Sequence, residues 1–221
     1  MSSHHVVRDA QEPALIIANG EACSWDLIQQ AMAWSPVVMV LDGALDRVLD
    51  LGLHIDVVLG DFDHPSIHDI QAKVLPETKI IHTPDQDKTD LEKGLEWLIN
   101  HHFKAVNVLW ATGLRSDHFL NNIGILARYK HQLDVVMLDD YCKMYLIQSG
   151  FKKHFEKDHA LSLMPLNKVT NLTTSNLVWN LNQSTLEYPY STSSSNRIRE
   201  TSLLEVSFAS CALLLIESNK N

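Results

Sequence analysis

The sequence predicts an α/β protein: an N-terminal, mostly parallel sheet flanked by helices (Rossmann-like), followed by a C-terminal all-β sandwich domain. Up to about residue 140, short apolar runs alternate with segments of helical periodicity, which is the pattern of βαβ crossovers in a parallel sheet. After Asp139-Asp140 the helical periodicity stops. The short segments separated by turn residues that follow are typical of an antiparallel sandwich or small barrel. We therefore expect two domains, residues 1–140 and 141–221.

The N-terminal half contains short apolar runs that are rich in branched residues and bounded by turn or charged residues, as strands are. The predicted strands are Ala14–Ala18, Val37–Leu41, Val57–Leu59, Lys79–His82, Val106–Trp110 and Val135–Leu138. The helices expected between them are Trp25–Trp34, Ala44–Leu51, Ser66–Lys73, Thr89–His102 and Asp117–Lys130. Ser24 is a candidate N-cap of the first helix, Pro36 follows its end, and Pro65 precedes the third helix.

The C-terminal half is predicted to consist of short strands. They are Tyr141–Gln148, Lys152–Phe155, Leu161–Met164, Val169–Leu172, Leu177–Leu181 and Leu203–Phe208, and the last strand is expected to be Ser207–Ile216. The polar run Ser191–Asn196 is expected to be a flexible loop or a binding loop.

Composition narrows the function classes. Of the 221 residues 45% are hydrophobic and 20% charged, which is an ordinary globular balance. The net charge of −9 argues against a nucleic-acid partner, although it allows an anionic substrate if metal ions supply positive charge. Cys23, Cys142 and Cys211 are odd in number and scattered, which indicates a reducing, cytoplasmic setting. The N-terminus lacks the apolar core of a signal peptide, and no apolar run is long enough to span a membrane.

Two carboxylates follow the predicted strand Val57–Leu59. Asp61 and Asp63 come directly after Gly60, at the carboxyl end of the strand, which is the edge where open α/β sheets bind ligands. Two close carboxylates repel unless a cation lies between them, and Mg²⁺ prefers oxygen ligands together with substrate phosphates. Taken alone, this stretch is equally compatible with a solvated acidic turn.

A second acidic cluster, Asp85-Gln86-Asp87-Lys88-Thr89-Asp90, lies between the fourth strand and a strong helix. One interpretation is helix capping, with Asp87 or Thr89 as the cap and Glu92 closing a capping box. The other is a metal site, because this loop and the first acidic loop emerge on the same edge of a parallel sheet.

A third segment, Thr112 to His118, follows the fifth strand and opens a helix. A glycine, a helix N-terminus and the forked donor Arg115 together suit a phosphate. The alternative is that Asp117 caps the helix and Arg115 is an ordinary surface residue, and His118 alone is expected to be structural. Asp42, with Gly43 at the end of the second strand, is either a cap or a ligand contact.

Taken in this order, these residues resemble the thiamine pyrophosphokinase family. The matching segments are Asp42-Gly43, Gly60-Asp61-Phe62-Asp63, Asp85–Asp90, Arg115-Ser116-Asp117-His118 with Asn122, Val178-Trp179-Asn180-Leu181 and Ser195-Asn196. The sequence departs from the family pattern at His64, where serine is usual, and at Leu114, where a second glycine is usual.

The resemblance implies an α/β catalytic domain that binds Mg²⁺ and ATP, a β-sandwich domain that binds thiamine, and a homodimer with thiamine between the subunits. The reaction would transfer the diphosphate of Mg-ATP to the thiamine hydroxyl, giving thiamine diphosphate and AMP. The implied catalytic residues are Asp61, Asp63, Asp90, Arg115 and Asp117, and the implied metal ligands are Asp61, Asp63 and Asp87. The implied substrate contacts are Asp42, Gln86, Thr89, Asn122, Trp179, Ser195 and Asn196.

Alternatives remain open at this point. The acceptor could be another small alcohol such as a hydroxymethylpterin, or the chain could be a non-catalytic nucleotide- or metal-binding module whose acids only cap helices. Trp179 could stack on thiamine or be plain sandwich core. No residue stands out as a general base. Because no Gly-x-x-x-x-Gly-Lys-Ser/Thr stretch occurs, we expect AMP and not ADP as the nucleotide product.

Overall fold

The computed structural model describes residues 14–63, 66–209 and 212–219, so the N-terminal tail, His64, Pro65 and Cys211 lie outside the described residues. The chain divides into two compact units, Met1–Ile125 with Tyr129–Asp139, and Leu126–Arg128 with Asp140–Asn221. No helix among the described residues is long and apolar enough to cross a membrane. In the same part of the chain, Cys23 and Cys142 form no disulfide.

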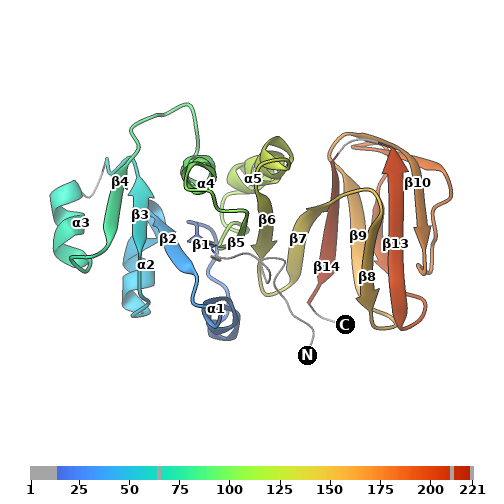
Figure 1. Ribbon diagram of the computed structural model, residues 1–221, viewed down its shortest axis with the longest axis horizontal. Helices are drawn as coiled ribbons and strands as arrows, with labels where there is room; N and C mark the ends of the chain where they lie inside the picture. The colour runs from blue at the N-terminus through green and yellow to red at the C-terminus, as the bar shows by residue number, and fades with distance from the viewer. Residues whose placement is uncertain (1–13, 64–65, 210–211, 220–221) are drawn as a thin grey trace. The chain divides into compact units, whose positions relative to one another are not determined.

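The first unit contains a parallel sheet with strand order β6-β5-β1-β2-β3-β4 (Figure 1). The strands are β1 Ala14–Ile17, β2 Val37–Leu41, β3 Val57–Gly60, β4 Lys79–His82, β5 Ala105–Leu109 and β6 Asp134–Leu138. The helices are α1 Trp25–Met32, α2 Leu45–Asp50, α3 Ile67–Lys73, α4 Asp90–Asn100 and α5 Ser116–Tyr129, and a 3₁₀ turn η2 spans Asp42–Ala44. The predicted parallel sheet with flanking helices is therefore confirmed.

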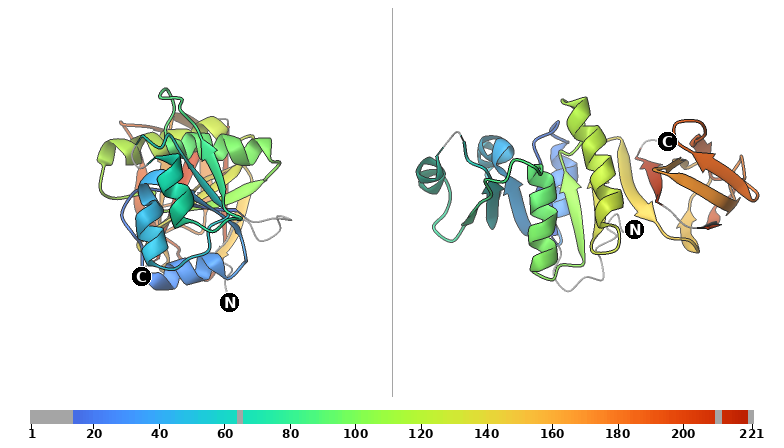
Figure 2. Two further views of the ribbon diagram at one scale, coloured as in Figure 1. Left: turned by 90° about the vertical axis from the view of Figure 1, so that its left-hand side faces the viewer. Right: turned by 90° about the horizontal axis from the view of Figure 1, so that it is seen from above.

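Helices cover both faces of this sheet. Figures 1 and 2 show α4 and α5 over one face and α1 and α2 over the other. As expected for strands covered on both faces, β1, β3 and β5 are buried throughout. Helix α4 comes especially close to the sheet at Gly94, where an added Cβ would lie 3.1 Å from the sulfur of Met39. The strand order reverses at β1, because β2 lies on one side of it and β5 on the other. In open α/β sheets ligands bind beside such a reversal, at the carboxyl ends of the strands.

Side-chain caps fix where the helices begin. The Ser24 hydroxyl accepts a hydrogen bond from the Leu27 amide, and Ser66 and Asp69 form a complete capping box at α3. Helix α1 ends at Met32, earlier than the predicted Trp34, because Ser35 turns the chain with a left-handed φ of 48°.

The second unit consists of two antiparallel sheets, β12-β9-β14-β7 and β11-β10-β13-β8. Its strands are β7 Cys142–Ile147, β8 Phe151–Phe155, β9 Ala160–Pro165, β10 Lys168–Ser175, β11 Ser184–Glu187, β12 Ser193–Arg197, β13 Ser202–Ala209 and β14 Leu213–Ser218. Alternate residues of β10 and β13 are buried, for example Val169, Leu204 and Val206, so the inner faces form the core expected of a sandwich.

Three predicted boundaries in this unit are wrong. Leu177–Leu181 is not a strand but a turn, because the Asn180 carboxamide oxygen accepts a hydrogen bond from the Leu177 amide at 2.9 Å and closes the chain locally. Ser191–Asn196 is not wholly a loop, since β12 begins at Ser193 and pairs with β9. The described part of Ser207–Ile216 belongs to two strands, β13 and β14.

The second unit also buries a charged cluster. Lys143 on β7 pairs in register with Glu217 on β14, and both are almost fully buried. The Tyr145 hydroxyl and the Lys153 ammonium both donate to Glu217, the latter at 2.7 and 2.8 Å. Burial lowers the pKa of Lys143 to about 8, against an ordinary value of 10.5, and the nearby Lys153 acts in the same direction.

This shift predicts a pH-dependent stability. Between pH 8 and 10 the unfolded chain holds a proton on Lys143 that the folded chain has lost, so the free energy of unfolding should rise with pH in this window. The Lys143→Met variant should lose that rise, whereas Lys152→Met, which removes an exposed lysine paired with Glu205, should keep it. Urea unfolding at pH 7.5 and 9.5 measures the difference, and an equal rise in Lys143→Met would contradict the prediction.

Candidate functional site

A cleft of about 290 Å³ opens at the carboxyl ends of β1, β2, β3 and β5 in the first unit. Its floor comes from the strand ends, including Ala18, Leu41 and Trp110, and its walls come from the loops that follow them. Seven residues singled out from the sequence line it together: Asp42, Asp61, Gln86, Thr89, Asp90, Arg115 and Asn122. Residues from four separate segments of the chain therefore converge where the strand reversal predicts a ligand site.

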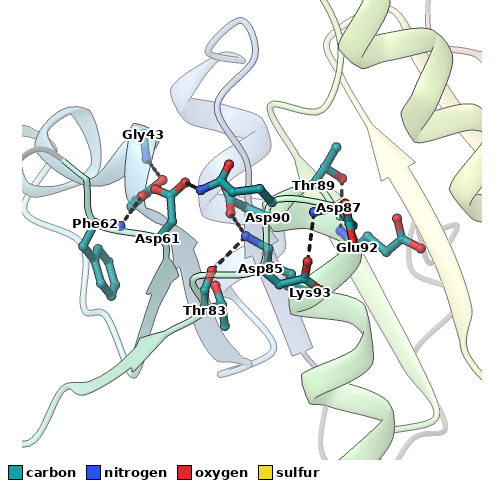
Figure 3. Close-up of polar contacts among 12 residues, drawn as sticks. Gly43, Asp61, Phe62, Thr83, Asp85, Asp87, Thr89, Asp90, Glu92 and Lys93 are labelled. Atoms are coloured by element: carbon teal, nitrogen blue, oxygen red, sulfur yellow. Dashed lines mark hydrogen bonds and ion pairs between the residues drawn. The ribbon is translucent and has the colours of Figure 1, made fainter.

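Asp42 lies at the start of η2 and is the most enclosed acid of the cleft. Its carboxylate accepts hydrogen bonds from the backbone amides of Gly43 and Phe62 (Figure 3). Gly60 is required here, because a Cβ at that position would clash with the Asp42 carboxylate. Burial raises the pKa of Asp42, and the negative charges of Asp90 and Asp61 raise it further.

Asp61 joins the two acidic loops. Its carboxylate accepts a hydrogen bond from the Gln86 side chain at 3.0 Å, and this bond is the main cause that lowers the pKa of Asp61. The same loops are also linked through the backbone, since the Thr83 amide donates to the Gly60 carbonyl at 2.8 Å. The segment carrying Asp85 to Asp90 is thus held against the segment carrying Asp61.

Thr89, and not Asp87, caps helix α4, because the Thr89 hydroxyl accepts a hydrogen bond from the Glu92 amide. Asp87 is exposed outside the cleft lining, and its amide donates to the Asp85 carboxylate at 2.9 Å within the loop. The Glu92 carboxylate accepts a hydrogen bond from the Tyr129 hydroxyl at 2.9 Å. Asp90, in the first turn of the helix, does line the cleft.

Arg115 and Asp117 form a forked ion pair at the start of helix α5. Nε of Arg115 donates to Oδ1 of Asp117 at 3.0 Å, and Nη2 donates to Oδ2. The interpretation of Asp117 as the helix cap is wrong, since Arg115 occupies the N-cap position, and the Arg115 side chain makes no capping hydrogen bond. The Arg115 guanidinium holds the pKa of Asp117 well below its usual range. Arg115 lines the cleft and Asp117 does not.

Asn122 supports the loop that precedes α5. Its buried amide donates to the Ala111 carbonyl at 3.0 Å, which holds the backbone at the end of β5. Leu114 accommodates the turn where glycine is usual: it adopts a φ of 50°, and its side chain is exposed. The segment from Gly113 to Arg115 therefore presents backbone and a guanidinium to the cleft.

Two polar residues of the cleft lining, Asn19 and Lys93, were not foreseen as site residues. Asn19 follows β1 just as the acids follow β2 and β3, so its position at a strand end could have indicated it. The Arg47 guanidinium donates a hydrogen bond to the Asn19 side-chain oxygen at 2.8 Å. Lys93 lies within α4 and reaches the cleft with an almost fully buried side chain. A lysine in a helix gives no such signal in the sequence.

Three predicted residues of the second unit form a local cluster. The Trp179 side chain is 62% exposed, so the alternative that it is sandwich core is wrong. Asn196 is buried and holds the Trp179 turn, since its side chain accepts from the Trp179 amide at 3.2 Å and donates to the Trp179 carbonyl at 2.8 Å. The Ser195 amide donates to the Ser162 hydroxyl at 3.0 Å. An exposed indole is thus presented on a fixed backbone.

The acidic residues do not form a preassembled metal cage. Within residues 14–63, 66–209 and 212–219, no group of three or more His, Cys, Asp or Glu side chains is arranged to hold a metal ion. The donors facing the cleft are carboxylate oxygens of Asp42, Asp61 and Asp90. This donor set fits Mg²⁺, which is usually bound by one or two carboxylates together with substrate phosphates.

Comparison with known proteins gives a consistent result. The family model "Thiamin pyrophosphokinase, catalytic domain" matches residues 28–137, and "Thiamin pyrophosphokinase, vitamin B1 binding domain" matches residues 150–213. A thiamine pyrophosphokinase 1 of Oryza sativa subsp. japonica is 27% identical over 159 residues, which is 66% of this chain and 60% of that protein. A thiamin pyrophosphokinase 1 of Caenorhabditis elegans is 31% identical over 120 residues, 49% of this chain and 47% of that protein. The chain thus spans about three fifths or less of the length of these relatives.

Solved structures share the fold. The thiamine pyrophosphokinase of Bacillus subtilis matches with a TM-score of 0.77 at 21% identity, covering 95% of this chain and 100% of that one. Yeast thiamin pyrophosphokinase matches with a TM-score of 0.82 at 16% identity, covering 95% of this chain and 87% of that one. At these identities the likeness establishes the architecture of both units.

Proposed function

The chain belongs to the thiamin pyrophosphokinase family, and on that premise we propose that it transfers the β,γ-diphosphate of Mg-ATP to the hydroxyl of thiamine, giving thiamine diphosphate and AMP. The observation that carries the proposal is the convergence of three carboxylates, an arginine and an open helix N-terminus in one cleft. Phosphoryl transfer requires mainly positioning and charge neutralisation, and this set supplies both.

The acids are proposed to receive the cation that accompanies ATP. Asp61, Asp63, Asp87 and Asp90 are the candidate ligands, and Asp61 and Asp90 are favoured because they line the cleft. When bound, Mg²⁺ would neutralise phosphate oxygens and orient them for displacement. Asp42 holds the backbone of the Phe62 loop through its hydrogen bonds and so sets the position of Asp61.

The opposite wall is proposed to bind the phosphates. Helix α5 offers backbone N–H groups of its first turn, because the N-cap residue Arg115 makes no side-chain capping bond to them, and Arg115 offers a forked donor. In the reaction the thiamine oxygen bonds to the β-phosphorus, the bond from that phosphorus to the α,β-bridging oxygen breaks, and AMP leaves. The hydroxyl proton is lost in the same step, and we assign no side chain to accept it.

The acceptor is proposed to bind the second unit. The exposed indole of Trp179 offers a flat π-face to the cationic ring of thiamine, which is worth about 0.5–2 kcal/mol for a cation over an aromatic ring. Asn196 fixes this turn, and Ser195, which is hydrogen-bonded to Ser162, contributes a hydroxyl group. We further propose a homodimer in which thiamine lies between the subunits.

The decisive experiment incubates the protein with ATP, Mg²⁺ and either thiamine or 6-hydroxymethylpterin and separates the nucleotides by chromatography. AMP formed in equal amount to thiamine diphosphate supports the proposal. AMP formed only with the pterin alcohol would reassign the acceptor, stoichiometric ADP would exclude diphosphate transfer, and no turnover with either alcohol would favour a binding module.

The thiamine contact gives a separate prediction. Trp179→Ala should raise the KM for thiamine by about tenfold, in line with the loss of a stacked cation, and leave the KM for ATP nearly unchanged. Tyr190→Ala is the matched control, because it removes another exposed aromatic ring from the same unit. Steady-state kinetics with each substrate varied gives both constants. An unchanged KM for thiamine, or loss of a cooperative melting transition, would contradict this role.

A further inference from the structure

Lys93 occupies a position that is unfavourable for a lysine. Its side chain is only 6% exposed, and it lies in the first turn of α4, where the helix dipole disfavours a cation. Taking an ammonium group out of water costs several kcal/mol unless it is paired. Burial and the helix dipole both disfavour a charge on Lys93, which implies that its charge has a role in this site.

Its contacts show where that charge is directed. The Lys93 ammonium donates to the Thr83 carbonyl at 2.9 Å and to Oδ1 of Asp90 at 3.2 Å (Figure 3). Thr83 precedes the loop 84–89 and Asp90 follows it, so Lys93 joins the two ends of the acidic loop. The Asp90 carboxylate is thereby fixed on the wall of the cleft.

The other lysine and the arginine of the cleft lining are paired with acids outside it. Lys88 donates to both oxygens of Glu96 at 2.8 and 2.9 Å, and Arg115 is paired with Asp117. Among the lysines and arginines that line the cleft in the described part of the chain, Lys93 is the one whose ion pair is with a lining carboxylate. His118 is the remaining basic residue of the lining.

We propose that Lys93 is a positioning residue and the internal counter-ion of the acidic cleft. Its ammonium holds Asp90 in place and compensates one negative charge, so that the cleft takes a divalent cation together with nucleotide phosphates and not the cation alone. The role in turnover rests on the proposed function, whereas the effect on cation binding follows from the charges of the cleft.

The test measures binding of Mn²⁺ alone, by calorimetry without nucleotide, to the wild-type chain and to Lys93→Met. Removal of one positive charge near the three carboxylates should tighten Mn²⁺ binding by about tenfold or more, while turnover with ATP and thiamine falls by a similar factor. A merely structural lysine would give the opposite sign, because a loosened site binds the ion more weakly. Lys93→Arg keeps the charge and should bind Mn²⁺ within about twofold of wild type.

Lys88→Met is the matched control, because it removes a lining lysine that is paired with Glu96. Mn²⁺ binding to Lys93→Met that is unchanged or weaker, or equal tightening in Lys88→Met, would overturn the proposal. If Lys93→Met does not fold, Lys93→Met/Asp90→Asn removes both charges of the pair and should bind Mn²⁺ no more tightly than wild type; tighter binding would contradict the assignment. A wild-type chain that forms no AMP would refute the proposed function and leave the Mn²⁺ comparison intact.

Discussion

Asp61→Asn is expected to lower AMP formation by at least about 100- to 1,000-fold, as loss of a group that stabilises developing charge does. Asp61 lines the cleft, and the hydrogen bond from Gln86 lowers the pKa of its carboxyl group, so it is the best-placed oxygen donor for the incoming cation. Asparagine keeps the shape and removes the charge. Turnover measured at saturating ATP, Mg²⁺ and thiamine gives the effect directly.

The stability of the same variant separates a metal-binding role from a structural one. Loss of the charge weakens the bond from Gln86 but relieves repulsion on Asp42, so the melting temperature without metal should change little. Asp46→Asn is the matched control: Asp46 is an exposed acid paired with Lys73 on the neighbouring helices, outside the cleft. A large loss of stability with near-normal turnover in Asp61→Asn would make this acid structural.

Asp63→Asn distinguishes the two acids of the first loop. Asp63 is exposed and does not line the cleft, although its sequence position implied an equal role as a metal ligand. We expect a loss of turnover that is smaller than that of Asp61→Asn. If both act on one bound assembly, the double variant should be scarcely worse than Asp61→Asn alone. A double variant that multiplies the two single losses would show independent roles.

The site in the first unit was predictable because strand ends are visible in the sequence. The apolar runs before Asp42 and Asp61 have the length and branching of buried strands, and Asp90 opens a segment with the leucine spacing of a helix. Parallel strands bring their carboxyl ends to one edge. The same reasoning could not find Lys93, because its role depends on burial against Thr83 and Asp90 and not on any local pattern.

The second unit was harder to predict for two local reasons. The apolar residues of Leu177–Leu181 suggest a strand. However, the Asn180 and Thr174 side chains accept hydrogen bonds from the Leu177 and Leu181 amides and close a turn. The polar residues from Ser193 to Arg197 suggest a loop. However, they form a strand that pairs with β9, with a bulge at Ser195, whose φ is 56°. Side-chain hydrogen bonds decided the first case and pairing with β9 decided the second, and neither set of contacts is visible in a single sequence.

Arg115→Ala is expected to be the other variant with a large effect, about 10³- to 10⁵-fold in kcat, as when an arginine that stabilises a transferring phosphoryl group is removed. The Arg115 side chain is 68% exposed, lies at the N-terminus of α5 and lines the cleft. Arg115→Lys should recover little, because an ammonium group cannot reproduce the fork. The melting temperature should hardly change, since exposed ion pairs contribute little to stability.

Asp117→Asn shows whether the ion pair positions Arg115 or holds it away from the phosphates. Asp117 is outside the cleft lining, and its carboxylate holds two of the guanidinium nitrogens, so we expect it to act through Arg115. If it positions the arginine, Asp117→Asn should lose about tenfold in kcat with a smaller change in the KM for ATP, and Arg115→Ala/Asp117→Asn should match Arg115→Ala. Higher kcat/KM in Asp117→Asn than in wild type would mean that the pair competes with the phosphates. Additional loss in the double variant would give Asp117 a role of its own.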